Sequence, residues 1–157
     1  LLTRLDDESI KKRFKLIELD GLLLDIIGEY MLLATQKDVI LEIEALESLH
    51  VKGDETLLPI LLTNLIDNAL KYTPKGKKIT LSLVNNRFII KDEGVGIALK
   101  DQGQVFEKFF QVASGLKNQT PGFGLGLTMV KKIAVLHSFQ LHLQSEENKG
   151  TTITVSF

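Results

Sequence analysis

The 157-residue sequence contains no cysteine, which excludes disulfides, zinc–thiolate sites and cysteine nucleophiles together. It also lacks any run of about eighteen apolar residues, so no segment is expected to span a membrane. An excess of charge is absent too, because the formal net charge is −1. No strong electrostatic field therefore points to nucleic acid or an anionic membrane, and we expect the chain to contact neither.

The composition that is present, 44% hydrophobic and 25% charged, is typical of a single globular domain with a full core. The chain begins at Leu1-Leu2 without a methionine or a signal peptide, which suggests a fragment of a longer protein. Residues 1–12 have an amphipathic helical pattern. We expect residues 1–13 to be the end of a longer helix with its linker, and 14–157 to form the main domain.

The segment 57–72 predicts an amphipathic helix whose narrow polar face has an unusual composition. At about 100° per residue, this face spans an arc of about 100°. Asparagine is a mediocre helix former, so two of them one turn apart suggest that a ligand is coordinated. A merely solvated face remains the alternative on this helix alone. The polar residues are Asn64, Asp67, Asn68 and Lys71.

The remaining pattern alternates helices with antiparallel strand pairs and predicts a two-layer α/β sandwich with a mixed, mostly antiparallel sheet. Asp20 is placed to cap a helix over 21–37, and Asp54 to cap the asparagine-bearing helix. A further helix is expected over 123–137, and a short helical piece over 104–110. Strands are expected at 14–19, 39–44, 49–51, 79–83, 87–91, 140–145 and 151–157, with a tight turn at Asn85-Asn86.

Two glycine-rich segments offer candidate ligand sites. Residues 92–97, Asp-Glu-Gly-Val-Gly-Ile, follow a strand and place a buried acceptor beside backbone that a flat ligand can approach. A plain turn is the alternative there. Residues 121–127, Pro-Gly-Phe-Gly-Leu-Gly-Leu, lead into a helix and present free N–H groups to an anion. This segment matches neither the dinucleotide fingerprint nor the P-loop.

The order and spacing of these stretches resemble the catalytic ATP-binding domain of bacterial two-component sensor histidine kinases, of the GHKL superfamily. Residues 64–73 are similar to its N box, 92–97 and 122–127 to its two glycine boxes, and 106–110 to its F box. Gly150-Thr151-Thr152 resembles its closing turn. The resemblance implies the Bergerat fold, with helices on one face of the sheet and an ATP lid at about 98–121. Its length and glycine content predict that this lid is not ordered without nucleotide.

The resemblance implies ATP and Mg²⁺ as cofactors and gives individual residues a role. Asn68 would bind Mg²⁺, Lys71 a phosphate and Tyr72 the ribose or the adenine edge. Asp92 would accept from the adenine amino group, and Thr151 would support the adenine pocket. Asn64 and Lys71 are the candidate catalytic residues. The implied cofactor-binding set is Asn64, Asn68, Lys71, Tyr72, Asp92, Gly94, Gly96, Ile97, Lys108, Gly122, Phe123, Gly124, Leu125, Gly126, Leu127 and Thr151.

Asn64 distinguishes between two reactions within this superfamily. Hydrolytic relatives of gyrase, chaperone and mismatch-repair type carry at this position a glutamate that activates water. An amide cannot act as that base, so Asn64 favours phosphoryl transfer to a side chain over hydrolysis. One departure from the kinase pattern is Gln111, which stands where many members have an arginine that follows the F box.

The resemblance further implies that the γ-phosphoryl group passes to a histidine on a dimerisation domain that is absent from the chain, and then to an aspartate of a response regulator. The parent protein is expected to be a homodimer anchored in the inner (cytoplasmic) membrane, with this domain in the cytoplasm. An anti-sigma-type serine kinase and a nucleotide-binding pseudo-kinase are the alternatives. None of His50, His137 and His142 precedes a phosphoacceptor signature. We expect the first and last to be strand residues and His137 a cation at a helix end.

Overall fold

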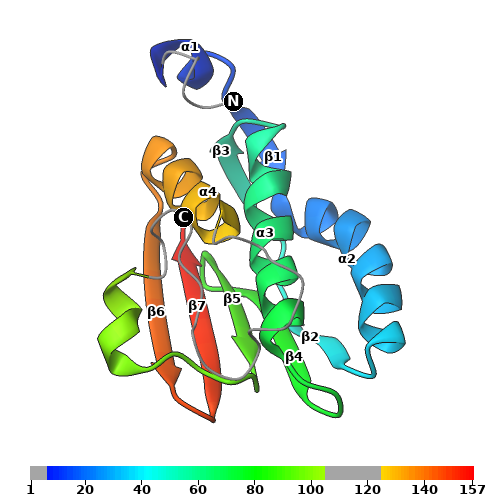
Figure 1. Ribbon diagram of the computed structural model, residues 1–157. Helices are drawn as coiled ribbons and strands as arrows, with labels where there is room; N and C mark the ends of the chain where they lie inside the picture. Colours follow the sequence, from blue (N-terminus) through cyan, green and yellow to red (C-terminus); the bar gives the residue numbers. More distant parts are fainter. Residues whose placement is uncertain (1–6, 105–124) are drawn as a thin grey trace.

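A computed structural model describes residues 7–104 and 125–157 (Figure 1). The first residues of the expected N-terminal helix, most of the expected lid and residues 122–124 lie outside this part of the chain. The helical piece expected over 104–110 also falls outside it, apart from its first residue. The expected domain boundary at residue 13 stays a prediction.

In the described part of the chain, the main sheet contains five strands in the order β2-β4-β5-β7-β6. The strands β2 and β4 pair in parallel, while the other neighbouring strands pair antiparallel. The predicted mixed, mostly antiparallel sheet is thus confirmed. The strands are β2 (Ile40–Leu46), β4 (Lys78–Val84), β5 (Arg87–Asp92), β6 (Gln140–Glu146) and β7 (Gly150–Ser156).

The helices α3 and α4 cover one face of this sheet, and α2 lies beside them (Figure 1). A second, two-stranded sheet pairs β1 with β3, antiparallel, next to the start of α3. The described part of the chain contains no helix that is both long and apolar enough to cross a membrane. The remaining elements are α1 (Asp7–Lys11), β1 (Lys15–Glu18), α2 (Leu19–Gln36), β3 (His50–Gly53), α3 (Leu57–Tyr72), the 3-10 helix η1 (Leu99–Gln104) and α4 (Leu125–Leu136).

The apolar arc of α3 is the centre of the core, as the helical period predicts. Every hydrophobic side chain of this arc is at most 5% exposed. The sheet contributes alternate residues of its strands to the same core, because side chains of a strand point to opposite faces in turn. The α3 residues are Leu57, Leu58, Leu61, Leu62, Leu65, Ile66, Ala69 and Leu70, and the strand residues include Ile79, Leu81, Leu83, Phe88, Ile90, Ile153 and Val155.

The predicted cap at Asp20 is wrong, because α2 begins at Leu19 and Asp20 lies within its first turn. Leu19 is 1% exposed, and its N–H donates to the Leu49 carbonyl at 2.8 Å. The Asp20 carboxylate accepts the Leu49 N–H at 3.1 Å instead of capping α2. Burial of Leu19 therefore sets the helix start, and Asp20 ties α2 to the loop before β3.

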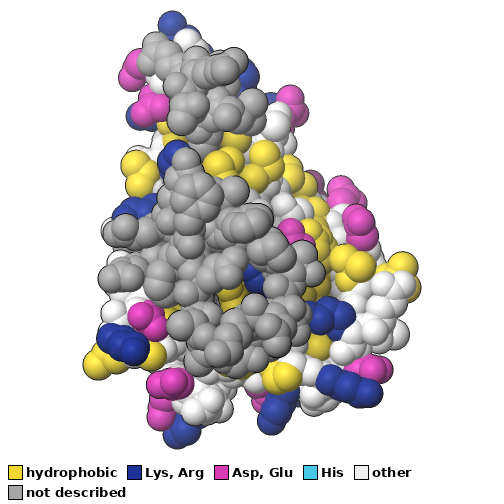
Figure 2. All heavy atoms as spheres, in the orientation of Figure 1, with side chains coloured by type: hydrophobic (Ala, Val, Ile, Leu, Met, Phe, Trp, Pro, Cys, Tyr) yellow, Lys and Arg dark blue, Asp and Glu magenta, His cyan; other side chains and the backbone are white. Residues whose placement is uncertain are grey.

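The predicted turn between β4 and β5 is confirmed, since Asn85 and Asn86 both have positive φ angles of 53° and 61°. Asparagine tolerates this left-handed conformation, which two-residue hairpin turns require. The helix α2 keeps apolar side chains exposed, among which Leu24 and Leu32 are 52% and 60% exposed. Figure 2 shows hydrophobic and acidic side chains together over this helix.

Candidate functional site

The polar face of α3 lies against the first turn of α4. Asn64, Asn68, Lys71 and Tyr72 are all half-buried. A Cβ atom placed on Gly126 would lie 3.7 Å from the Asn64 Oδ1 atom. The amide of Asn64 and the start of α4 are therefore neighbours, as a site built from the predicted N box and second glycine box requires.

Lys71 and Tyr72 end this face of α3. The Lys71 Nζ atom lies 5.3 Å from the centroid of the Tyr72 ring, which is within the range of a cation–π contact. Burial lowers the pKa of Lys71 below its ordinary value. A cation that has lost part of its hydration interacts more strongly with an anion that enters the same space.

Asp67, a member of the polar face of α3 without a predicted role, receives a hydrogen bond from the Tyr30 hydroxyl on α2. Burial, followed by the charge and hydrogen bond of Asp67, raises the pKa of Tyr30 above its ordinary value. Burial also raises the pKa of Asp67, to which Glu29 adds, while the bond from Tyr30 opposes the shift. This pair joins α2 to α3 directly beside Asn68.

Asp92 ends β5 and is 8% exposed. Its Oδ1 atom accepts the N–H groups of Gly94 at 2.9 Å and Thr151 at 3.2 Å. Burial raises the pKa of Asp92 to about 6, although both hydrogen bonds act in the opposite direction. Both of these bonds use Oδ1, so Asp92 has a second oxygen with which to accept from a ligand.

The loop after Asp92 is pressed against the end of α3. The Val95 N–H donates to the Tyr72 carbonyl at 3.3 Å, and a Cβ on Gly94 would lie 2.5 Å from the same oxygen. Gly96 has a φ of +69°, and a Cβ there would lie 2.0 Å from the Glu146 carbonyl oxygen. Both glycines are thus required by close approach of the chain to itself, whether or not a ligand also approaches them.

Ser145 on β6 joins the two halves of the site and was not among the residues predicted for it. Its hydroxyl accepts the Ile97 N–H at 2.8 Å and lies 2.8 Å from the Thr151 hydroxyl. In the β6–β7 ladder Ser145 stands opposite Thr151, so antiparallel pairing of the strands predicted at 140–145 and 151–157 was the signal that could have located it. A pocket of about 540 Å³ opens at this edge of the sheet, lined among others by Asp92, Gln102, Ser145 and Thr151.

Of the second glycine box, only Gly126 and the buried Leu127 have described side-chain surroundings. Among the described residues, nothing comes closer than 3.7 Å to a Cβ built on Gly126. Packing within the described chain thus leaves room for a side chain there, unlike at Gly94 and Gly96. The predicted site residues Lys108, Gly122, Phe123 and Gly124 lie outside the described residues, as do the F box and Gln111.

The donor groups fit a magnesium nucleotide. Across residues 7–104 and 125–157, no group of three or more His, Cys, Asp or Glu side chains is placed to hold a metal ion. The amide oxygen of the half-buried Asn68 is a neutral donor of the kind that can join phosphate and water oxygens around Mg²⁺. The Thr73 hydroxyl, directly after α3, is buried without a hydrogen-bond partner among the described residues.

The prediction that His137 is a cation at a helix end is wrong. His137 is buried, and its Nε2 atom accepts the Asp54 N–H at 3.0 Å. Its Nδ1 atom lies 2.8 Å from the Ile133 carbonyl, so Nδ1 is the protonated nitrogen of a neutral ring. Burial lowers the pKa of His137, although Ile133 and Asp54 oppose the shift. His50 and His142 lie in β3 and β6, as predicted.

The fold and these groups define a nucleotide-binding α/β sandwich. Residues 53–157 match the family of histidine kinase-, DNA gyrase B- and HSP90-like ATPases, and the chain belongs to this family. The predicted family resemblance is confirmed, and the chain is an ATP-binding domain of this class.

Similar proteins include sensor histidine kinases. The sensor-like histidine kinase SenX3 of Mycobacterium tuberculosis is 33% identical over 144 residues, which make up 89% of this chain and 35% of that protein. Among solved structures, the mycobacterial sensor histidine kinase MprB is 26% identical with a TM-score of 0.79, covering 90% of this chain and 95% of that one. Full-length ShkA in complex with AMPPNP is 25% identical with a TM-score of 0.71, covering 90% of this chain and 30% of that one. The chain thus spans about a third of the curated relative.

Proposed function

We propose that this chain is the catalytic domain of a sensor histidine kinase, which binds Mg-ATP and transfers its γ-phosphoryl group to a histidine on a dimerisation domain. The observation that carries the proposal is the amide of Asn64 beside Gly126 at the start of α4. A hydrolytic member of the family needs a carboxylate there to take a proton from water, and an amide cannot do so.

The nucleotide would lie between α3 and the loop that follows β5. The second oxygen of Asp92 would accept from the adenine amino group, while Thr151 and Ser145 hold that carboxylate and the loop in place. Lys71 and the N–H groups at the start of α4 would face the phosphates, where a partly desolvated cation and a helix N-terminus favour anions. Asn68 would hold Mg²⁺, which when bound neutralises phosphate charge.

The reaction proposed for this site needs positioning rather than a base. The bond between the γ-phosphorus and the bridging oxygen of ADP breaks, and a bond from the phosphorus to an imidazole nitrogen forms. The acceptor ring supplies its own lone pair and releases its proton to solvent. Asn64 can orient the γ-phosphate without activating water, so the phosphoryl group is kept for the acceptor.

The names of the relatives support the same role. SenX3 and MprB are sensor histidine kinases, and ShkA was solved with AMPPNP, an ATP analogue. We further infer that the acceptor histidine passes its phosphoryl group to an aspartate of a response regulator. The parent protein would be a homodimer anchored in the cytoplasmic membrane, with this domain in the cytoplasm.

The test is to mix the chain with Mg-ATP labelled at the γ-phosphate and a separate dimerisation-helix fragment. We expect label on the fragment that is lost in acid and stable in alkali, as for a phosphohistidine. A fragment whose acceptor histidine is replaced by glutamine is the matched control and should stay unlabelled. Release of free phosphate without labelled fragment would contradict the proposal and favour hydrolysis.

A further inference from the structure

The segment between α1 and β1 is held by a buried carboxylate at the start of α3. The Nε and Nη2 atoms of Arg13 donate to Asp54 Oδ2 at 3.1 and 2.9 Å. The other oxygen of Asp54 accepts the N–H groups of Thr56 and Leu57, as the predicted cap of α3 requires. One carboxylate, whose side chain is 3% exposed, thus both caps α3 and binds Arg13.

The same segment contacts the end of α4 through His137. The Phe14 ring stacks on the His137 ring with centroids 4.4 Å apart and planes 12° apart. Phe139 also stacks on His137, at 5.0 Å. The Asp54 N–H donates to His137, so the segment before β1, the start of α3 and the end of α4 meet in one cluster.

The charge of Asp54 depends on this cluster. Burial by itself raises the pKa of Asp54, but the N–H groups of Thr56 and Leu57 and the Arg13 guanidinium outweigh it, and the pKa falls below its ordinary value. Loss of Arg13 would leave a buried carboxylate with backbone donors alone, which is costly. Ile10 of α1, at 1% exposure, belongs to the hydrophobic core cluster.

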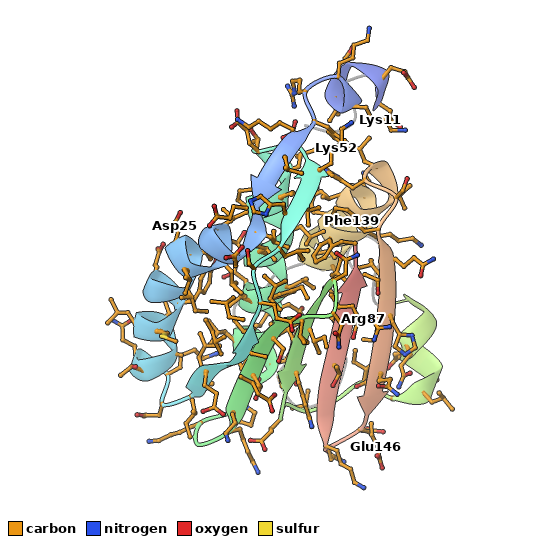
Figure 3. All side chains as sticks on the ribbon, turned by 180° about the vertical axis from the view of Figure 1, so that it is seen from behind. Lys11, Asp25, Lys52, Arg87, Phe139 and Glu146 are labelled. Atoms are coloured by element: carbon orange, nitrogen blue, oxygen red, sulfur yellow. The ribbon has the colours of Figure 1, made fainter. Side chains whose placement is uncertain are left out.

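The cluster is remote from the candidate nucleotide site although it touches both helices that build it. Figure 3 shows Phe139 and Glu146 at opposite ends of β6, and Glu146 adjoins Gly96 of the nucleotide loop. Gly126 lies at the start of α4 and His137 directly after its end, which separates them by about 16 Å at about 1.5 Å per residue. Substitutions in the cluster can therefore change the orientation of α1 without changing any residue that contacts the nucleotide.

We propose that Arg13, Phe14, Asp54 and His137 form a latch that fixes α1 in one orientation against the nucleotide-binding domain, and that opening the latch frees α1 while nucleotide affinity is retained. The latch is defined by contacts within this chain. Its consequence for catalysis rests on the proposed function, in which the acceptor histidine belongs to a dimerisation domain, to which residues 1–13 are expected to connect. The latch would then influence where that domain stands relative to the bound nucleotide.

The test follows exchange of the Phe14 amide, which donates to the Lys11 carbonyl at 3.1 Å, and cleavage after Lys11 and Lys12 by a lysine-specific protease. The variants are Arg13→Gln and Asp54→Asn, of which the second keeps a good capping residue for α3. We expect exchange and cleavage to be about tenfold faster in both, because a charge-assisted hydrogen bond to a buried group is lost.

The matched control is Lys15→Gln, which removes the exposed ion pair of Lys15 with Glu55 between the same two parts of the fold. An exposed pair contributes little, so its exchange rate should change by less than about twofold. Mg-ATP affinity, measured by calorimetry, should stay within about twofold of wild type in all three variants.

If the Phe14 amide exchanges at the wild-type rate in Arg13→Gln and Asp54→Asn, the latch does not exist. Faster exchange accompanied by lost Mg-ATP affinity would overturn its independence from the nucleotide site. If the wild-type chain does not bind Mg-ATP at all, the proposed function fails, while the exchange and cleavage rates still decide whether the latch exists.

Discussion

Asp92 and Thr151 lie 59 residues apart in the chain, yet the Thr151 N–H donates to Asp92 Oδ1 at 3.2 Å. The two residues also face each other in the β5–β7 ladder. The bond fixes one oxygen of a buried carboxylate, and the other is the oxygen proposed to accept from the adenine amino group. A buried carboxylate of this kind is expected to lower the stability of the ligand-free protein. Its charge is expected to be compensated only when a ligand donates to it.

We expect Asp92→Asn to weaken Mg-ATP binding by at least about tenfold in calorimetry, because the amide can donate where the adenine amino group also donates. The amide oxygen can still accept from Gly94 and Thr151. Glu93→Gln is the matched control: it makes the same change in the adjacent exposed side chain, which accepts the Lys78 N–H. Equal affinity of Asp92→Asn and wild type would remove Asp92 from the site.

The same variant should be more stable than wild type above pH 6. Burial raises the pKa of Asp92 to about 6 in the folded protein from 3.8, so the folded state binds the proton more tightly than the unfolded state. The penalty of the charged form is fully present above pH 6 and is relieved as the pH falls toward 3.8. A shift of this size corresponds to at most about 3 kcal/mol. Urea unfolding at pH 7.5 that finds Asp92→Asn less stable would contradict this explanation.

Substitution by alanine distinguishes two kinds of glycine in the site: those that packing within the chain requires, and one where the described chain leaves room for a side chain. Gly94→Ala should lower stability by about 2 kcal/mol or more, since its Cβ would overlap the Tyr72 carbonyl oxygen at 2.5 Å. Gly126→Ala should leave stability unchanged or raise it by up to about 1 kcal/mol, because alanine is the better helix former. Its Mg-ATP affinity should nevertheless fall, since a methyl group would stand where the phosphates approach. Normal affinity in folded Gly126→Ala would exclude close approach of the ligand there.

Asn68 is tested by the difference in ATP affinity with and without magnesium. We expect wild type to bind ATP more tightly in Mg²⁺ than in EDTA. Asn68→Ala should lose most of that difference, because a metal ligand is removed, and its affinity for ATP in Mg²⁺ should fall by about tenfold or more. Asp67→Asn changes the preceding side chain, which points to Tyr30, and should keep the full difference. If Asn68→Ala keeps it as well, the metal ligand lies elsewhere.

The sequence predicts α3 well because its helical period alone decides which residues are buried, and this is a local property. Residues whose roles depend on distant contacts could not be predicted in this way. His137 is neutral because burial lowers its pKa and because its Nε2 atom accepts the N–H of Asp54, 83 residues earlier in the chain. The Ser145 hydroxyl is part of the site because Ile97, 48 residues before it, turns back toward β6. Asp20 failed as a cap because burial of the neighbouring Leu19 outweighed local capping preference.

The pH dependence of stability offers a test of the neutral His137. Its pKa in the folded state is below the 6.5 of the unfolded state, so below pH 6.5 the unfolded chain binds a proton that the folded chain does not. Stability should therefore fall with decreasing pH, by up to about 1.4 kcal/mol per pH unit, until the folded pKa is reached. Asp92 acts in the opposite direction over much of the same range, since its pKa is about 6.

The measurement is thus best made in the Asp92→Asn background, by urea unfolding at intervals between pH 5 and 8. With Asp92 removed, we expect the loss of stability below pH 6.5 to be steeper than in wild type. Adding His137→Gln should flatten the curve between pH 5 and 7 at a lower overall stability, because the group that titrates is gone. A curve that stays steep without His137 would show that another group is responsible and that His137 does not titrate in this range.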